Sequence, residues 1–237
     1  MKQLKHCITL GIISLMALGS FAADSREKVT NAAKQVGDKS NYSWTTSTKE
    51  ADGSPARLSQ IEGKAEKGGV TWLSFAVGGL PVEVCMKGEK GAAKALEGWQ
   101  TFDDIAQTGG TAAAVVRFLR SYQAPVAESA SLAGKVNELK EVDGALSGEL
   151  KEDAVKELLL FGARRREGQE PPKTADTKGS VKFWVKDGGL AKYEINVQGK
   201  VTAGERESVI NRTITVEIKE VGTTKLEVPD EAKQKMT

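Results

Sequence analysis

The sequence predicts an α+β domain in which a curved antiparallel sheet is covered by a few helices. Three observations predict this class: a run with helical spacing near the start, short alternating runs broken by glycine-rich turns, and longer alternating runs near the end. Alternating runs with one apolar face are typical of antiparallel strands that lie on a core. One early helix, many such strands and a few further helices together define an α+β domain.

The first 22 residues have the order of a secretory signal peptide. A basic start precedes the apolar run Cys7–Leu18, and the small-residue stretch Gly19–Ala23 follows it. The apolar run is shorter than the roughly 20 residues that span a bilayer, although a retained membrane helix is the alternative. Cys7 stands at the start of the apolar run, whereas a lipid-anchored protein has its cysteine directly after the run. We therefore expect cleavage after Ala22, export to the periplasm or the extracellular space, and no lipid anchor.

Removal of residues 1–22 leaves a single domain, residues 23–237, and changes its composition. The formal net charge falls from +2 to about zero because two lysines are removed, and His6, the one histidine of the sequence, is removed too. Cys85 is then the only cysteine, so an intramolecular disulfide is impossible. Without histidine, catalytic triads and histidine-based zinc sites are excluded. We expect a monomer that does not span the membrane, with no enzymatic activity, no cofactor, no metal and no nucleic-acid partner.

The mature chain opens with an expected helix, followed by strands. In Ser25–Val36 the apolar residues recur at helical spacing, and Gly37 ends the run. From Tyr42 to Lys87, short runs rich in valine, threonine and aromatic residues are separated by glycine-containing turns. Two of these runs, Val70–Val77 and Pro81–Lys87, alternate apolar with polar residues. We predict strands joined by tight turns across this region.

The middle of the chain mixes helices and strands. Thr111–Tyr122 has helical apolar spacing and is stopped by Pro125, whereas Glu152–Phe161 is a further expected helix after the short strand Ala145–Leu150. Ala163–Lys178 contains charges and prolines but almost no apolar residue, which predicts a mobile loop. Its three consecutive arginines would either bind an anionic group or form a solvated charge run, and we favour the solvated run.

The last third returns to strands. Ser180–Lys186, Leu190–Val201 and Asn211–Lys219 each alternate with one apolar face. Between the first two runs, Asp187-Gly188-Gly189 predicts a tight hairpin, since glycine adopts positive φ without strain. The chain then closes in a polar stub, Asp230–Thr237.

The mature chain contains few motifs that could indicate a catalytic or phosphate-binding site. Ser25–Lys28 has the Ser-x-x-Lys spacing of penicillin-interacting serine enzymes but lacks their partner motifs. Gly88–Gly91 lacks the strand–loop–helix context of a phosphate-binding loop, so we interpret its glycines as turn residues. Acidic pairs such as Asp103 and Asp104 are unavoidable among 32 acidic residues. Cys85 falls on the polar side of its run, where we expect an inert strand residue rather than a nucleophile.

Two stretches of the C-terminal half carry a family resemblance. Glu141–Phe161 gives a strand, a turn and a helix, and Gly179–Glu194 gives a hairpin with Trp184 in one strand and Tyr193 in the other. The remaining shared features are the endings Val221-Gly222 and Val228-Pro229. Residues 141–235 thus resemble the C-terminal half of LolA/LppX-type carriers, which are exported lipoprotein- and lipid-carrier domains, and the preceding helix and strands agree with this family in order.

The resemblance implies a half-open antiparallel β-barrel closed by helices, with an apolar cavity for acyl chains. Because the chain lacks the lipid-anchor cysteine of LppX-type members, it implies a free carrier or a repurposed scaffold. Such a site leaves no motif, since burial stabilises acyl carbon by about 0.8 kcal/mol per CH₂ without any charged contact. The candidate cavity residues are Trp44, Trp72, Leu73, Phe75, Val115, Phe118, Leu119, Trp184, Tyr193 and Ile195. Each of them would also suit an ordinary core or sheet surface.

The resulting interpretation is an exported, non-enzymatic binding protein whose partner is a hydrophobic acyl ligand or an envelope protein. It would carry a lipid or a lipidated protein in an apolar cavity. The main alternative is a secreted structural or protein-interaction module on the same scaffold without a ligand, and an enzyme is the third. A cavity of several hundred Å³ with apolar walls favours a carrier, whereas a filled interior favours a module.

Overall fold

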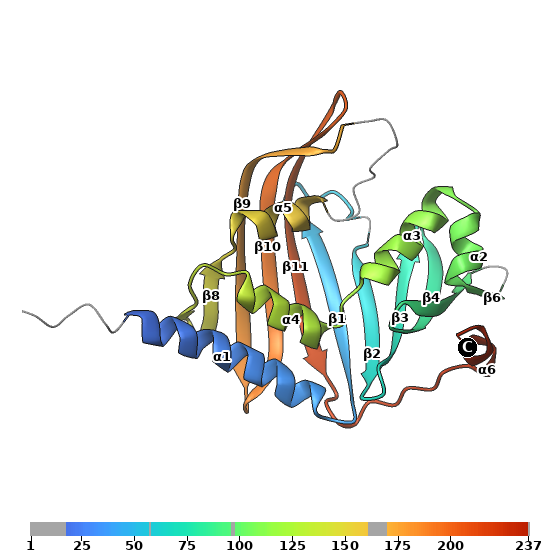
Figure 1. Ribbon diagram of the computed structural model, residues 1–237, viewed down its shortest axis with the longest axis horizontal. Helices are drawn as coiled ribbons and strands as arrows, with labels where there is room; N and C mark the ends of the chain where they lie inside the picture. Colours follow the sequence, from blue (N-terminus) through green and yellow to red (C-terminus); the bar gives the residue numbers. More distant parts are fainter. Residues whose placement is uncertain (1–17, 57, 96–97, 161–169, 237) are drawn as a thin grey trace, which may run out of the picture.

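The computed structural model describes residues 18–56, 58–95, 98–160 and 170–236. The strands of this part are β1 (Asn41–Glu50), β2 (Gln60–Glu66), β3 (Val70–Val77), β4 (Leu80–Lys87), β5 (Lys90–Ala95), β6 (Gly98–Thr101), β7 (Lys140–Val142), β8 (Ala145–Glu149), β9 (Lys173–Lys186), β10 (Gly189–Ala203) and β11 (Arg206–Lys219). They form one antiparallel sheet in the order β6-β5-β4-β3-β2-β1-β11-β10-β9-β8-β7 (Figure 1). The sheet is open, with β6 and β7 at its two edges.

The helices of the described residues are α1 (Leu18–Gly37), α2 (Phe102–Gln107), α3 (Gly110–Ser121), α4 (Pro125–Gly134), α5 (Glu152–Leu160) and α6 (Asp230–Lys235). Helices α1, α3, α4 and α5 lie on one face of the sheet, which we name the concave face (Figure 1). Helix α6 contacts β5 and β6 and belongs to a separate cluster on the opposite face. The predicted α+β class, with a curved antiparallel sheet and a few covering helices, is confirmed. No helix of the described residues is both long enough and apolar enough to cross a membrane.

Several predicted elements are confirmed with small shifts of their ends. The expected helix Ser25–Val36 lies within α1, where Val29, Ala32, Ala33 and Val36 are buried. The first turns of α1 include Leu18–Ala22 of the expected signal segment, whereas residues 1–17 lie outside the described part. The four strands β1 to β4 occupy the region where strands and tight turns were predicted.

One local prediction, on Gly91, is wrong, and two helices lie where none was predicted. Pro125 does more than end the preceding helix: it occupies the first turn of α4, where a proline suits the helix because its φ is fixed and its missing N–H is not needed. Gly91 is a strand residue rather than a turn residue, and a Cβ there would lie 2.3 Å from Cζ of Phe102. The polar stub contains α6, whose Ala232 is fully buried.

The predicted loop Ala163–Lys178 is shorter than expected. Its last part, Lys173–Lys178, belongs to β9, and Ala175 is paired with Lys200 of β10. Here the backbone hydrogen bonds to β10 outweigh the lack of apolar side chains, because they satisfy the strand's polar groups. The arginines Arg164–Arg166 lie outside the described residues, and the mobility of the segment stays a prediction.

The predicted hairpin after β9 is confirmed. Asp187 has a φ of 51° and Gly188 a φ of 79°, the pair of positive values that a type I′ turn requires. Lys186 and Gly189 face each other across this turn, so that β9 and β10 start their pairing directly beside it. A shift of register between Leu190 and Lys192 then places Phe183 opposite Tyr193, and both are fully buried in the core.

Candidate ligand-binding face

The register of the central strands decides which side chains face the concave side. On β11 these are Ile210, Arg212, Ile214, Val216 and Ile218. Their partners on β10 are Gly199, Val197, Ile195 and Tyr193, opposite Ile210, Arg212, Ile214 and Val216 respectively. Tyr193, Ile195 and Val197 have no exposed surface. An apolar row therefore crosses the middle of the sheet, and Arg212 is its one charged member.

Helix α5 forms one flank of this face. It lies close to the sheet because two strand positions carry glycine. A Cβ at Gly199 would lie 2.7 Å from Cδ1 of Leu159, and a Cβ at Gly179 would lie 2.7 Å from Cγ2 of Val155. Larger residues at either position would push the helix away from β9 and β10.

Helix α3 forms the other flank. Its Phe118 meets Phe75 of β3 edge to face, with 6.3 Å between the ring centroids, and Tyr122 at the end of the helix, with 5.6 Å. Val116 and Leu119 of the same helix are buried. The concave face between α5 and α3, which we name the trough, has β1, β2 and β11 as its floor.

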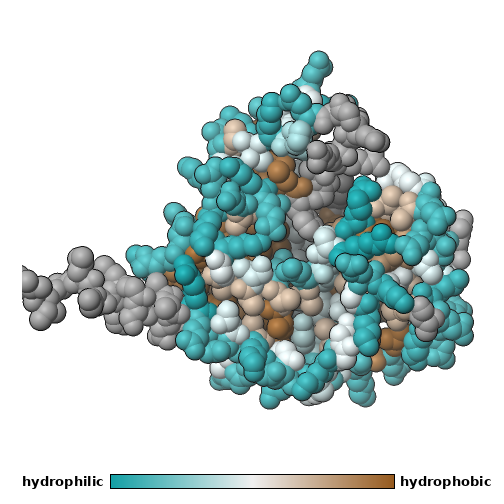
Figure 2. Space-filling model, viewed as in Figure 1, coloured by the Kyte–Doolittle hydropathy of each residue, from teal (hydrophilic) through white to brown (hydrophobic). Residues whose placement is uncertain are grey.

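Apolar side chains around the trough are only partly buried. They include Ile210 and Ile214 on the floor, Leu158 on α5 and Phe118 on α3. Figure 2 shows apolar residues on this face of the molecule, bordered by hydrophilic residues. The trough therefore contains apolar side chains that pack against the core without being fully buried.

Below the trough, α4 covers the sheet through a cluster of polar aromatic side chains. The cluster contains all three tyrosines of the chain, Tyr42, Tyr122 and Tyr193. The indole Nε1 of Trp44 donates a hydrogen bond of 3.1 Å to the hydroxyl of Tyr122, and the hydroxyl of Tyr193 donates to the carboxylate of Glu128 on α4. Each polar tip thus has a partner inside an apolar region, as buried polar groups require.

Burial changes the titration of this cluster. It raises the pKa of the Glu128 carboxyl, against the opposite effect of the hydrogen bond from Tyr193. Burial likewise raises the pKa of Tyr42 to about 12, and the pKa of Tyr193 well above its ordinary value, with the charge of Glu128 adding to the latter. These shifts follow from a low dielectric that disfavours charge, so the cluster marks a dry interior beneath α4.

On the trough floor, Arg212 faces Glu50 of β1 across the register. The Nε of Arg212 lies 3.8 Å from Oε1 of Glu50, which is too long for a hydrogen bond. The two side chains are 25% and 21% exposed, and Nε is buried without a hydrogen-bond partner among the described residues. A loosely paired, mostly buried arginine is uncommon, because an unsatisfied buried donor costs about 1–3 kcal/mol.

The structure brings together most of the predicted cavity residues. Those that share the concave-face cluster are Trp44, Leu73, Phe75, Val115, Phe118, Leu119, Tyr193 and Ile195. Trp72 and Trp184 lie elsewhere. Trp72 packs against the cluster on the opposite face, beneath Lys64, and the ring of Trp184 has the Nζ of Lys192 above it at 4.7 Å. A large aromatic side chain in a strand thus does not reveal which face it occupies.

Four residues of this face were not predicted from the sequence: Tyr42, Tyr122 and Glu128 in the polar cluster, and Arg212 on the trough floor. A signal was available for Arg212, because it stands two residues before Ile214 in an alternating run and so shares its face. Glu128 had no such signal, since its run of small residues shows no clear apolar period.

The opposite face has a small cluster of its own. Cys85, Ala92, Trp99 and Ala232 are its buried members. Cys85 was expected on a polar strand face but is completely buried, because α6 covers this part of the sheet. Burial, followed by the charge of Glu83, raises the pKa of the Cys85 thiol to about 11. The thiol is therefore protonated and shielded, which agrees with the expected inert role.

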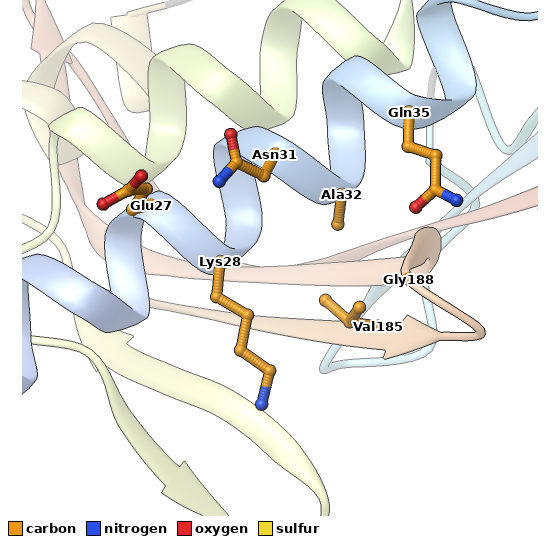
Figure 3. A pocket seen from close by; sticks show the side chains of 7 residues that line it. All are labelled: Glu27, Lys28, Asn31, Ala32, Gln35, Val185 and Gly188. Atoms are coloured by element: carbon orange, nitrogen blue, oxygen red, sulfur yellow. The ribbon is translucent and has the colours of Figure 1, made fainter.

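A second hollow lies between α1 and the hairpin of β9 and β10. It has a volume of about 600 Å³ and is bordered by Glu27, Lys28, Asn31, Ala32, Gln35, Val185 and Gly188 (Figure 3). Most of these side chains are polar or charged, so the hollow does not have the apolar walls expected for an acyl chain. In the described residues, no group of three or more histidine, cysteine or acidic side chains is placed to hold a metal ion.

No family model and no curated protein matches the sequence. Among solved structures, the chain is similar to LprF from Mycobacterium bovis, with 8% identity and a TM-score of 0.47, covering 89% of this chain and 98% of that one. The lipoprotein LppX from Mycobacterium tuberculosis gives 10% identity and a TM-score of 0.46, covering 87% and 99%. A putative outer membrane lipoprotein-sorting protein domain from Vibrio parahaemolyticus gives 11% identity and a TM-score of 0.23, covering 81% and 91%.

Proposed function

We propose that the protein is an exported, non-enzymatic binding protein that holds an acyl chain in the trough. The main support is the set of half-buried apolar side chains on the two flanks and the floor, such as Leu158, Phe118 and Ile214. They lie on the concave face of an open sheet, between the flanking helices α5 and α3. An apolar ligand in this position would complete the burial of these side chains.

The dimensions of the trough agree with this ligand. The part of the concave row on β11 that lies in the trough runs from Ile210 to Ile214, which at about 3.3 Å per residue gives roughly 13 Å. A single acyl chain occupies about half of the roughly 30 Å hydrocarbon layer of a bilayer. Because each buried CH₂ contributes about 0.8 kcal/mol, hydrophobic burial alone would supply a substantial affinity.

A second candidate is a protein-interaction module that binds no ligand. It is favoured by the packing beneath α4, where Trp44, Tyr122, Tyr193 and Glu128 fill the interior and satisfy one another. The two candidates differ in what occupies the trough: a lipid in the first, and only the chain's own residues or a partner protein in the second.

The decisive experiment is direct binding of an uncharged, fluorescent monoacylglycerol to the purified mature domain. The carrier predicts saturable binding at one site, with a dissociation constant that does not change between low and high salt, because transfer from water drives it. Mass spectrometry of organic extracts from protein purified out of its native envelope should then identify a co-purifying acyl compound. If no acyl probe binds at any salt concentration, the interaction module is the better description.

Export has a separate test. Removal of the signal peptide after Ala22 places Ala23 at the mature N-terminus. N-terminal sequencing of protein recovered from outside the cytoplasm should find Ala23 or Asp24 first. Recovery of peptides from residues 1–20 on that protein would show that the segment is retained.

A further inference from the structure

We propose that Arg212 binds the anionic head of the ligand, so that the protein selects single-chain amphiphiles with a carboxylate or phosphate head over neutral lipids. This inference rests on the proposed acyl-binding function and names its ligand class. It starts from the position of the side chain: Arg212 is the charged member of an otherwise apolar concave row on β11.

The surroundings of Arg212 are mainly apolar. Its partner on β10 is Val197, which has no exposed surface, and Ile210 and Ile214 stand two residues away on the same face of β11. Leu159 of α5 lies over the neighbouring Gly199. An acyl chain in contact with these side chains would bring its head group within reach of the guanidinium.

The guanidinium has unused hydrogen-bonding capacity. Arginine offers five N–H donors in a planar fork, and Nε of Arg212 is buried without a partner among the described residues. Its acidic neighbour, Glu50, stays 3.8 Å away and so does not saturate it. Carboxylate and phosphate oxygens match the arginine fork in a bidentate manner, which makes an oxyanion the chemistry that fits this site.

Glu50 has the opposite effect on such a ligand. Its carboxylate fixes the side of the trough on which the guanidinium lies, but it also repels an incoming anion. Removal of the Arg212 charge should therefore lower the affinity for an anion, whereas removal of the Glu50 charge should raise it. A pair that serves only to hold β1 against β11 would not show this pattern.

The test compares palmitate with hexadecanol, its uncharged analogue, on the unmodified mature domain, on Arg212→Gln and on Glu50→Gln. We expect Arg212→Gln to weaken palmitate binding about tenfold, as for the loss of a charge-assisted hydrogen bond, and Glu50→Gln to strengthen it. Hexadecanol affinity should stay the same in all three proteins. A parallel titration with palmitoyl lysophosphatidate distinguishes the head groups, since the preferred one loses more affinity in Arg212→Gln.

Several outcomes would overturn the inference. If hexadecanol and palmitate bind equally and Arg212→Gln changes neither, Arg212 is not a head-group site although the acyl-binding function stands. If neither compound binds the unmodified domain, the proposed function fails together with the inference. Should Arg212→Gln unfold because Glu50 loses its partner, the double variant Arg212→Gln/Glu50→Gln removes both charges, and it must also bind palmitate and hexadecanol equally.

Discussion

Trp44 of β1 lies directly opposite Gly63 of β2, and its indole ring occupies the space where a side chain at position 63 would be. A Cβ on Gly63 would lie 2.1 Å from both Cε2 and Cζ2 of the ring. The same indole donates its hydrogen bond to Tyr122, at the end of α3. Because Gly63 has no side chain, the indole of Trp44 fits against β2 and links the sheet to Tyr122 at the end of α3.

Gly63→Ala should therefore destabilise the domain. The methyl group would displace the indole from its place and weaken the bond to Tyr122, so we expect a loss of about 1–3 kcal/mol in the free energy of unfolding, measured by urea denaturation. Gly68→Ala is the matched control, since a Cβ at this nearby turn position meets no atom within 4 Å. It should change the free energy by less than about 0.5 kcal/mol. Equal effects of the two substitutions would contradict this account of Gly63.

Glu128→Gln should make the stability of the domain less dependent on pH. Burial raises the pKa of Glu128 in the folded state, so the folded protein favours the protonated carboxyl. The resulting stabilisation is complete below the ordinary pKa of 4.5 and is lost as the pH rises through the folded-state pKa. Relative to the unmodified protein, Glu128→Gln should gain stability as the pH rises, by at most about 1.4 kcal/mol per pH unit.

This prediction is checked by denaturation series at several pH values between 4 and 8. The control is Glu205→Gln, an exposed residue in the turn between β10 and β11, which should alter the unfolding free energy little at any pH. A constant difference between Glu128→Gln and the unmodified protein across this range would show that the carboxyl titrates as it does in the unfolded chain.

Much of the sheet could be predicted because alternation and turn chemistry are local. Leu73 and Phe75 alternate with polar residues in the sequence and are both buried on the concave face. The pair Asp187 and Gly188 predicts a hairpin turn, and both residues have a positive φ in the structure. Such signals need no knowledge of distant parts of the chain.

The site required information that lies far apart in the sequence. Glu50 and Arg212 become neighbours only because β1 pairs with β11, and Tyr193 meets Glu128 only because α4 covers β10. Helix α4 itself was missed, since its run of alanine and serine has no clear apolar period. Cys85 was assigned to a polar face because nothing near it in the sequence shows that α6 returns to cover it.

Access to Cys85 should depend on α6. The thiol is buried and its pKa is raised to about 11, so at pH 8 little thiolate is present and a disulfide reagent should label the mature domain slowly. Ala232→Asp places a charge in the buried contact of α6 and should accelerate labelling at least tenfold by releasing the helix. Glu231→Asp, at the exposed neighbouring position, is the control and should leave the rate unchanged. Equal rates in all three proteins would mean that α6 does not protect the thiol.

Phe118→Asp should abolish the uptake of an acyl probe while the fold is retained. Phe118 is half-buried on the α3 flank of the trough, and a carboxylate there would have to lose water when an acyl chain enters, which is costly in an apolar site. Trp184→Asp makes the same kind of change at a half-buried aromatic residue outside the trough, where Lys192 covers the ring, and should leave uptake unaltered. Fluorescence titration measures uptake, and far-ultraviolet circular dichroism confirms that both variants are folded.

If Phe118→Asp unfolds, Phe118→Ser is used in its place, with the same expectation of weakened uptake by a folded protein. Undiminished uptake by a folded Phe118 variant, or an equal loss in Trp184→Asp, would place the acyl chain outside the trough.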